Sequence, residues 1–342
     1  MNKDFLMAVW LRLIAASVFL AGVSLDVLAE EKSSTDRARE ALAQQGDDES
    51  ETAQLEEVFQ AAEKRYSMLK SGGKSLSYSF SYSYTSDSRI DLEVVNNVIR
   101  NLDVNPTATH SMTNSFSFAY GILNNVTIST NIPLSTRYDT TRELSVTDFG
   151  DISLGLRWQP FAYVPGRPTI TVNSSLSTKT GVSPYEINPQ RRLSTGSGTY
   201  SFSTGVNASK VLDPVVVFGS VNAGYSFEQN GLNQVRGGRV LKAVHNGQSF
   251  SFSGGFSYSL SYDTSLSIST NVSYNTATNL YFTDGTNAET QDSASGSMNM
   301  SLGIRVDPTT IINTSFGFGL TEDASDFNLG FSLPINIGAW TW

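Results

Sequence analysis

The segment Ser249-Phe250-Ser251-Phe252-Ser253-Gly254-Gly255-Phe256-Ser257-Tyr258-Ser259-Leu260-Ser261-Tyr262 decides the fold class. All of its aromatic and aliphatic residues have even numbers, and all of its serines have odd numbers. Successive side chains of a β-strand point to opposite faces, so this period of two predicts a strand with one apolar face and one small polar face.

The same alternation recurs along the chain from residue 74 onward. Twelve runs show it, and most are long enough to cross a hydrocarbon core as tilted strands, which takes about 9–11 residues. The runs cover residues 75–85, 111–121, 125–134, 150–158, 168–179, 198–211, 215–227, 249–262, 265–275, 293–306, 311–320 and 327–336. Tight turns such as Leu123-Asn124 alternate with long polar segments, which are residues 86–110, 135–149, 180–197, 228–248 and 276–292. Short turns on one side and long loops on the other are typical of outer-membrane barrels.

The two faces of these runs favour a membrane barrel over a soluble β-sandwich. A sandwich would carry many charged residues on its solvent face. In these runs the side chains at the polar positions are small and almost all uncharged. Since an unpaired strand edge in lipid is prohibitive, the strands must close. We therefore expect an all-β fold, a closed antiparallel transmembrane β-barrel of about twelve strands over residues 74–342. The candidates for residues that face its lumen are Asp151, Arg157, Lys179, Arg305 and Ser253.

The first 29 residues have the features of a secretory signal peptide. Lys3 and Arg12 supply positive charge, residues 13–23 are apolar, and Val27-Leu28-Ala29 places small residues before a predicted cleavage at Glu30. An uncleaved anchor is the alternative, but the apolar run is too short to span a bilayer comfortably. The chain has no cysteine and a net charge of −9, and this acidic balance argues against a nucleic-acid partner.

Residues 30–73 differ from the rest in being charged and helix-prone. Their apolar seam has the four-three spacing of a heptad repeat and consists of Leu55, Phe59, Ala62, Tyr66 and Leu69. This pattern predicts a helical segment in the periplasm, with three roles open: a plug or helix packed on its own barrel, a coiled coil that joins subunits, or a disordered leader.

Catalysis and metal binding find little support in the sequence. The only histidines are His110 and His245. His110 is followed directly by Ser111, so on a strand the two side chains would point to opposite faces. A catalytic serine and histidine must lie side by side, so these two residues cannot form such a pair. Without cysteines or clustered histidines, we expect no enzyme, no cofactor and no metal site.

Several segments resemble the outer-membrane family named for the MetA pathway of phenol degradation. The matching pieces are residues 120–126, 132–134, 149–152, 193–198, 210–216 and 320–327, in that order along the chain. The strand count and the helical N-terminal region also resemble the secretion channel of functional-amyloid systems. That second resemblance implies a homotrimer with a periplasmic coiled coil and a helical plug.

Together these features predict a channel or transporter in the outer membrane of a Gram-negative-type bacterium. The expected cargo is a small solute, with aromatic or hydrophobic compounds among the candidates. Secretion of a polypeptide such as an amyloid subunit, and a non-conducting structural or adhesive barrel, are the alternatives. Expected partners are outer-membrane lipid and the barrel assembly machinery, which would read the last strand and Trp342. The segment 86–110 is a candidate amphipathic stretch folded toward the pore.

Overall fold

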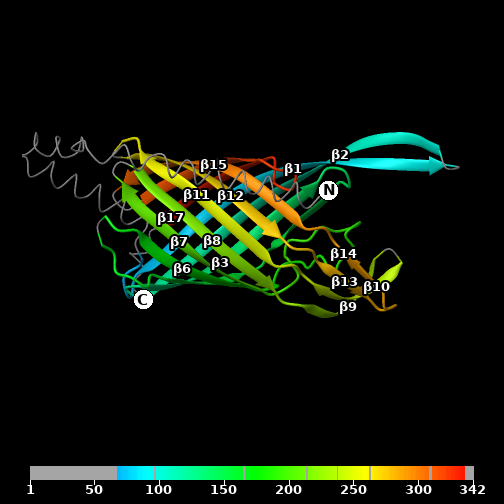
Figure 1. Cartoon of the computed structure of the whole chain (residues 1–342), viewed down its shortest axis with the longest axis horizontal. Helices are drawn as coiled ribbons and strands as arrows, with labels where there is room; N and C mark the ends of the chain where they lie inside the picture. The colour runs from blue at the N-terminus through cyan, green and yellow to red at the C-terminus, as the bar shows by residue number, and fades with distance from the viewer. Residues whose placement is uncertain are drawn as a thin grey trace, which may run out of the picture. The chain divides into compact units, whose positions relative to one another are not determined.

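A computed structural model describes residues 68–95, 98–164, 166–212, 215–236, 238–261, 263–307 and 310–335 (Figure 1). For residues 87–107 it describes the backbone alone, apart from positions 96 and 97. The described part forms two β-sheets, one of thirteen strands and one of four. No helix in this part of the chain is long and apolar enough to cross a bilayer.

The large sheet closes on itself into a barrel. Its strands are β1 (Lys74–Val95), β2 (Val98–Leu123), β3 (Val126–Asp139), β4 (Leu144–Phe149), β5 (Ser153–Trp158), β6 (Thr169–Ser177), β7 (Ser201–Leu212), β8 (Val215–Ser226), β11 (Ser249–Ser259), β12 (Thr264–Asn275), β15 (Ser293–Asp307), β16 (Thr310–Gly319) and β17 (Phe327–Ile335). Every neighbouring pair is antiparallel, and the β2–β3 pairing closes the ring. Since β4 and β5 both pair with β3, they share one position, and the ring has twelve. The predicted closed barrel of twelve strands is confirmed.

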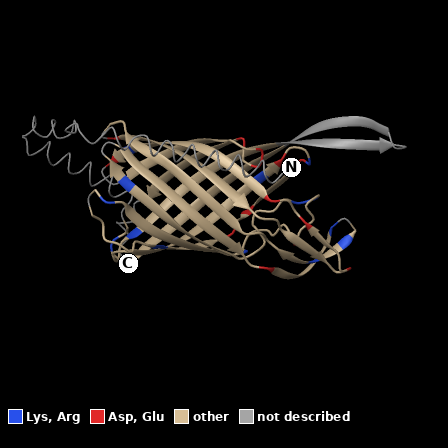
Figure 2. Cartoon of the chain, viewed as in Figure 1, with Lys and Arg blue, Asp and Glu red and all other residues tan. Residues whose placement is uncertain are grey.

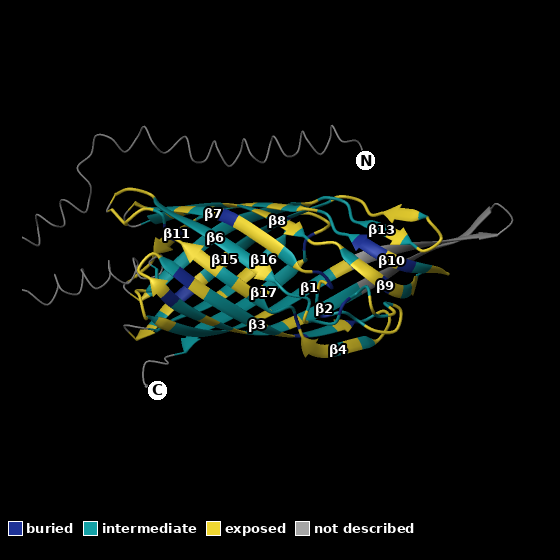
Figure 3. Cartoon of the chain, turned by 90° about the horizontal axis from the view of Figure 1, so that it is seen from below, coloured by how far each residue is buried: buried dark blue, intermediate teal, exposed yellow. Residues whose placement is uncertain are grey.

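The strand register keeps each kind of side chain on one face of the barrel wall. Phe252 lies opposite Val221 on one side and Val272 on the other, and it is 45% exposed. Ser253 lies opposite Ser220, and their hydroxyl groups are 2.6 Å apart. Directly opposite residues of antiparallel strands point to the same face, so apolar side chains gather outside and hydroxyls gather inside. The alternation is visible along the wall in Figure 3, and Figure 2 shows the charged residues mostly near strand ends and in connections.

The described part of the wall is interrupted where β4 gives way to β5. Residues 150–152 leave the ladder opposite Pro133 of β3, between the pairs Leu134–Phe149 and Asn131–Ser153. Proline has no N–H to donate across the ladder, which accounts for the interruption at this point. Gly150 N still donates to Pro133 O at 2.9 Å, so the strand is displaced without being released.

The segment 86–110 is not a separate stretch folded toward the pore, as the sequence suggested. Its backbone continues β1 and β2 as one long hairpin, paired from Lys74–Tyr120 to Val95–Val98 with a single irregularity at Glu93 and Val94. Continuous ladder hydrogen bonds satisfy the backbone of both arms, which favours extension of the hairpin over a new fold.

Two of the predicted long loops build a second sheet. Its strands are β9 (Gln229–Arg236), β10 (Arg239–His245), β13 (Asn279–Phe282) and β14 (Asn287–Glu289), in the order β14-β13-β10-β9. Leu232, Leu241 and Val244 form a small buried core against Tyr185, Leu280 and Phe282. This core explains why segments that look like polar loops in the sequence form strands.

The N-terminal predictions fall almost wholly outside the described residues. Residues 1–67 are not described, and with them the signal peptide and four seam residues, Leu55, Phe59, Ala62 and Tyr66. The fifth, Leu69, lies in a non-helical stretch just before β1. There Gly72 N donates to Gly121 O, and Ser71 N donates to the Asn124 side chain, so this stretch lies against the β2–β3 turn.

Candidate functional site: a loop at the barrel mouth

One loop is held across the end of the barrel where the long connections lie. We call it the mouth loop; it comprises residues 178–200 and joins β6 to β7. The short β7–β8 connection, between Leu212 and Val215, lies at the other end of β7. The mouth loop has no regular secondary structure, so its backbone groups need partners outside a strand ladder.

Asp151 holds the base of the mouth loop. This residue lies at the break in the wall, and its Oδ1 accepts from Gly181 N at 3.0 Å. Its Oδ2 accepts from Ser197 N at 2.6 Å and from the Ser197 hydroxyl at 2.7 Å. One carboxylate thus joins both arms of the loop to the wall, and hydrogen bonds to an ionised acceptor are the stronger kind.

The two arms of the loop touch where Asp151 binds them. A Cβ atom on Gly181 would lie 2.7 Å from the Cα atom of Gly196, so only glycine fits at this contact. The Thr195 hydroxyl donates to Phe149 O at 2.8 Å and accepts from Val182 N at 3.0 Å. We call this narrow base, residues 178–182 and 195–199 with Asp151, the neck.

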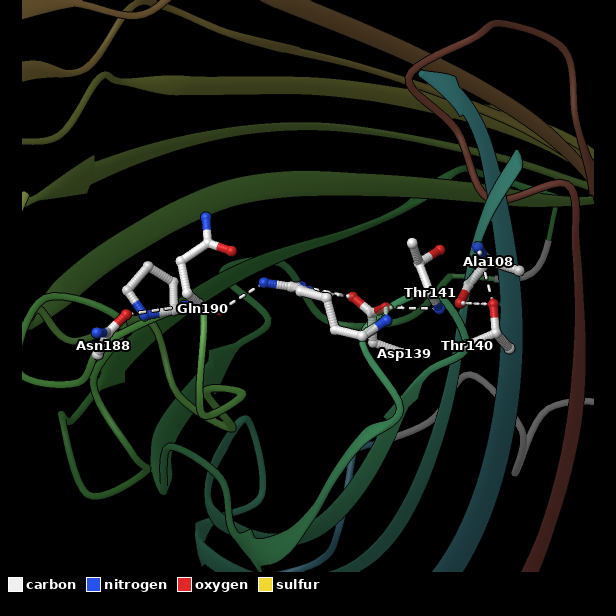
Figure 4. Close-up of polar contacts among 8 residues, drawn as sticks. Ala108, Asp139, Thr140, Thr141, Asn188 and Gln190 are labelled. Carbon is white, nitrogen blue, oxygen red and sulfur yellow. Dashed lines mark hydrogen bonds and ion pairs between the residues drawn. The ribbon is translucent and has the colours of Figure 1, made fainter. Parts of the chain in front are cut away.

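The tip of the mouth loop is tied to the turn that follows β3. Asp139 shapes that turn by accepting from the backbone N–H groups of Thr141 and Arg142, each at 3.0 Å. In turn, Arg142 Nε donates to the Asp139 carboxylate at 2.9 Å, and Arg142 Nη1 donates to Pro189 O in the loop. Figure 4 shows Asp139 on one side of this contact, and Asn188 and Gln190 on the other.

A second set of contacts ties the loop to the small sheet and its connections. The Tyr185 hydroxyl donates to the Asn246 side chain at 2.8 Å, and Asn246 Nδ2 donates to Thr199 Oγ1 at 3.0 Å. The Arg236 guanidinium donates to Pro184 O. Burial raises the pKa of the Tyr185 phenol, so this hydroxyl remains a neutral donor at physiological pH.

These contacts make the mouth loop a bridge. Its tip reaches the turn after β3 through Arg142, and Asn246 lies in the connection between β10 and β11. Around the ring, β3 and β11 are five steps apart through β5, β6, β7 and β8, out of twelve positions. A loop tied to connections at these separate positions of the rim narrows the opening between them.

The sequence-predicted site residues divide into two groups. Asp151 and Lys179 belong to the mouth, where Lys179 Nζ donates to Gln229 Oε1 at 3.2 Å. Arg157, Arg305 and Ser253 lie away from the mouth loop, on β5, β15 and β11, at the parity opposite to the exposed apolar side chains. Their part in lining the lumen stays a prediction.

Sequence reasoning missed the residues that tie the loop tip, namely Arg142, Asp139, Tyr185 and Arg236. None stands in a motif, and the contacts of Arg142, Arg236 and Tyr185 join residues that are 47, 52 and 61 positions apart in the sequence. One signal was present: three pieces of the family resemblance, residues 132–134, 149–152 and 193–198, meet at the neck.

His110 lies in a row of aromatic side chains on the outer face. It is flanked by Tyr84 and Tyr138, with ring centroids 5.2 and 6.1 Å away, and its Nδ1 is 2.8 Å from the Tyr82 hydroxyl. Among the residues that the structure describes, no group of three or more histidine or acidic side chains could hold a metal ion.

Comparison with solved structures places this barrel among known outer-membrane folds. The COG4313 outer membrane channel from Pseudomonas putida F1 matches with a TM-score of 0.61, covering 79% of this chain and 97% of that chain at 12% identity. The translocator domain of autotransporter NalP from Neisseria meningitidis matches less well, with a TM-score of 0.46 over 84% of this chain and 98% of that chain at 10% identity. At such identities the likeness shows the fold alone. No family model matches the chain, so both family resemblances remain predictions.

Proposed function

We propose that this chain is an outer-membrane channel that passes a small solute through its barrel, with the mouth loop as its constriction. The observation that carries the proposal is the closed ring with an apolar outer face, a polar inner face and one loop held across its end. An apolar outer face suits lipid, and a lumen lined with serine, threonine and asparagine suits water and polar solutes.

The inner face supports passage of solute because several of its hydroxyl and amide groups bond one another within the wall. Neighbouring strands exchange hydrogen bonds between side chains, as in Ser273–Ser295 at 2.6 Å, Ser257–Ser267 at 2.9 Å and Ser117–Asn131 at 2.7 Å. Side chains that bond one another bind a passing solute weakly. Weak binding along the path favours exit as well as entry, which conduction requires.

The mouth loop favours a small solute over a polypeptide. To admit an extended chain, the loop would have to release Arg142, Tyr185 and the neck together. The secretion alternative therefore needs a displacement of the whole loop, whereas a small solute needs only a gap beside it.

Planar-bilayer recording of the purified full-length protein tests the proposal. We expect discrete conductance steps, with open current rising when Tyr185→Phe and Arg142→Gln are combined to free the loop tip. A fully folded barrel that inserts without conducting, in the wild type and in this double variant alike, would instead support the structural or adhesive alternative.

The N-terminal segment has a proposed role in the periplasm, as a plug of its own barrel or as a coiled coil between subunits. Deletion of residues 31–70 with the signal peptide retained separates the two roles. Loss of an oligomer with unchanged single-channel current supports the coiled coil, whereas a larger or more persistent current supports the plug.

A further inference from the structure

A recess lies between the mouth loop and the inner wall, beside the middle of β2 and the end of β3. It has a volume of about 250 Å³. Its lining residues are Thr109, Arg137, Asp139, Arg142, Pro184, Ile187, Pro189, Arg192, Leu193 and Ser194. The wall residues among them share the inward parity of β3, opposite to the exposed Leu134 and Tyr138. A solute that passes the mouth loop on this side meets these side chains.

The charge of this recess is opposite to that of the whole chain. Three arginines and one aspartate line it, so the net charge of its lining is +2, whereas the full sequence has a net charge of −9. Such a local excess of positive charge attracts anions into a confined space.

Two of the three arginines are free to bind a ligand. Arg142 is engaged with Asp139 and Pro189. Within the part of the chain that the structure describes, the guanidinium groups of Arg137 and Arg192 donate no hydrogen bond. Arg137 is half-buried, and its interaction with Asp151 is electrostatic, without a hydrogen bond between them. The Asp151 oxygens are already occupied by Gly181 and Ser197. A guanidinium presents paired N–H donors that match the two oxygens of a carboxylate. A bound carboxylate would therefore supply the acceptors that Arg137 and Arg192 lack.

The rest of the lining is aliphatic. Pro184, Ile187, Pro189 and Leu193 of the mouth loop face the same recess as the arginines. Apolar walls beside a charged end suit a ligand with both characters, and a bare inorganic anion would leave them without a partner.

We propose that this recess is a binding site for a small organic carboxylate with an aliphatic body, held by Arg137 and Arg192 at its charged end and by the mouth loop along its apolar part. The inference rests on the proposed function, since it names the class of solute that the channel selects. Because Arg142 lines the same recess and holds the loop tip, the bound carboxylate lies at the point where the mouth narrows.

Equilibrium binding to the full-length protein in detergent tests the site without relying on conduction. Hexanoate is the probe, and hexanamide has the same shape without the charge. We expect hexanoate to bind at least tenfold more tightly than hexanamide, and the variant with Arg137→Gln and Arg192→Gln to lose that preference. Arg157→Gln is the matched control, because it removes one arginine of the same parity far from the recess, and it should leave the preference unchanged.

Several outcomes would overturn the inference. These are equal binding of hexanoate and hexanamide, loss of preference in Arg157→Gln, and inorganic phosphate binding as tightly as hexanoate. Heat-shifted electrophoretic mobility confirms that each variant is folded, and Arg137→Lys should retain part of the preference if charge matters. Bilayer current then separates the two ideas: a conducting channel that ignores hexanoate refutes the site alone, and a non-conducting barrel that binds hexanoate refutes the channel alone.

Discussion

The barrel wall and the mouth loop are held together in different ways. In the wall, backbone ladders join each of the twelve positions to two neighbours, and side chains need only the correct parity. The mouth loop is held in place by single side chains, with Asp151 at the neck and Arg142 at the tip. Ladder bonds are repeated many times, so each matters little, whereas the loss of one carboxylate at the neck removes three hydrogen bonds together.

This difference shows which region gives the barrel its stability and which region can move. A wall with redundant bonds tolerates change on its polar face and resists opening. A loop fixed by a few side chains can move without unfolding the barrel, as a constriction must. Substitutions in the two regions should therefore affect different measurements.

The largest effect is expected from a charge placed on the outer face of the wall. Phe252→Arg exchanges an exposed aromatic ring for a guanidinium against lipid, at a cost of about 2–4 kcal/mol near the bilayer midplane. Ser253→Arg adds the same group on the other face and should cost less while changing conductance. Unfolding in urea after refolding into vesicles measures both; equal losses of stability would show that the two faces are assigned wrongly.

The next effect is expected at the neck. Asp151→Ala leaves the donors on Gly181 and Ser197 without their acceptor, a loss of roughly 1.5–3 kcal/mol of loop anchoring by the usual scale for charged hydrogen bonds. Open current should become larger or noisier, with little change in the barrel's unfolding midpoint. Asp148→Ala is the control, since among the described residues this exposed carboxylate accepts only from its neighbour Phe149. If both variants change the current alike, surface charge rather than anchoring is the cause.

The contrast also explains what the sequence could and could not predict. Alternation such as that of residues 249–262 depends on each residue's own neighbours, so the twelve strands and their faces were predictable. The β9–β10 and β13–β14 hairpins were missed because their small core joins Leu232 and Leu241 to Leu280 from another connection. The neck was half visible: Asp151 stood out as a charge on a polar parity, but Gly181 and Ser197 become its partners only after the chain folds.

A smaller effect is expected from a methyl group at the neck. In Gly181→Ala the new Cβ meets the Gly196 backbone at 2.7–2.8 Å, and overpacking of this kind costs about 1–3 kcal/mol. The arms of the loop should separate, so the variant should raise open current while its barrel unfolds at the same urea concentration. Gly254→Ala in the wall is the matched control, because the nearest atoms to its Cβ lie 3.9 Å away. A shifted unfolding midpoint without a change in current would place the strain in the barrel and contradict this view of the neck.

The smallest effect is expected in the aromatic row that crosses the outer face of β17, β1, β2 and β3. The register places Phe327, Tyr84, His110 and Tyr138 directly opposite one another, with the Tyr84 ring 5.6 Å from Phe327 and 5.2 Å from His110. A row of this kind suits the membrane interface, where rings lie between headgroups and acyl chains. His110→Ala should lower stability by about 0.5–1.5 kcal/mol, the scale of one aromatic contact. His110→Phe keeps a ring in the row but loses the bond to Tyr82, so it should recover most of that loss. Urea midpoints in vesicles compare the three proteins, and a phenylalanine variant as weak as the alanine one would show that the Tyr82 hydrogen bond, not the row of rings, stabilises this part of the wall.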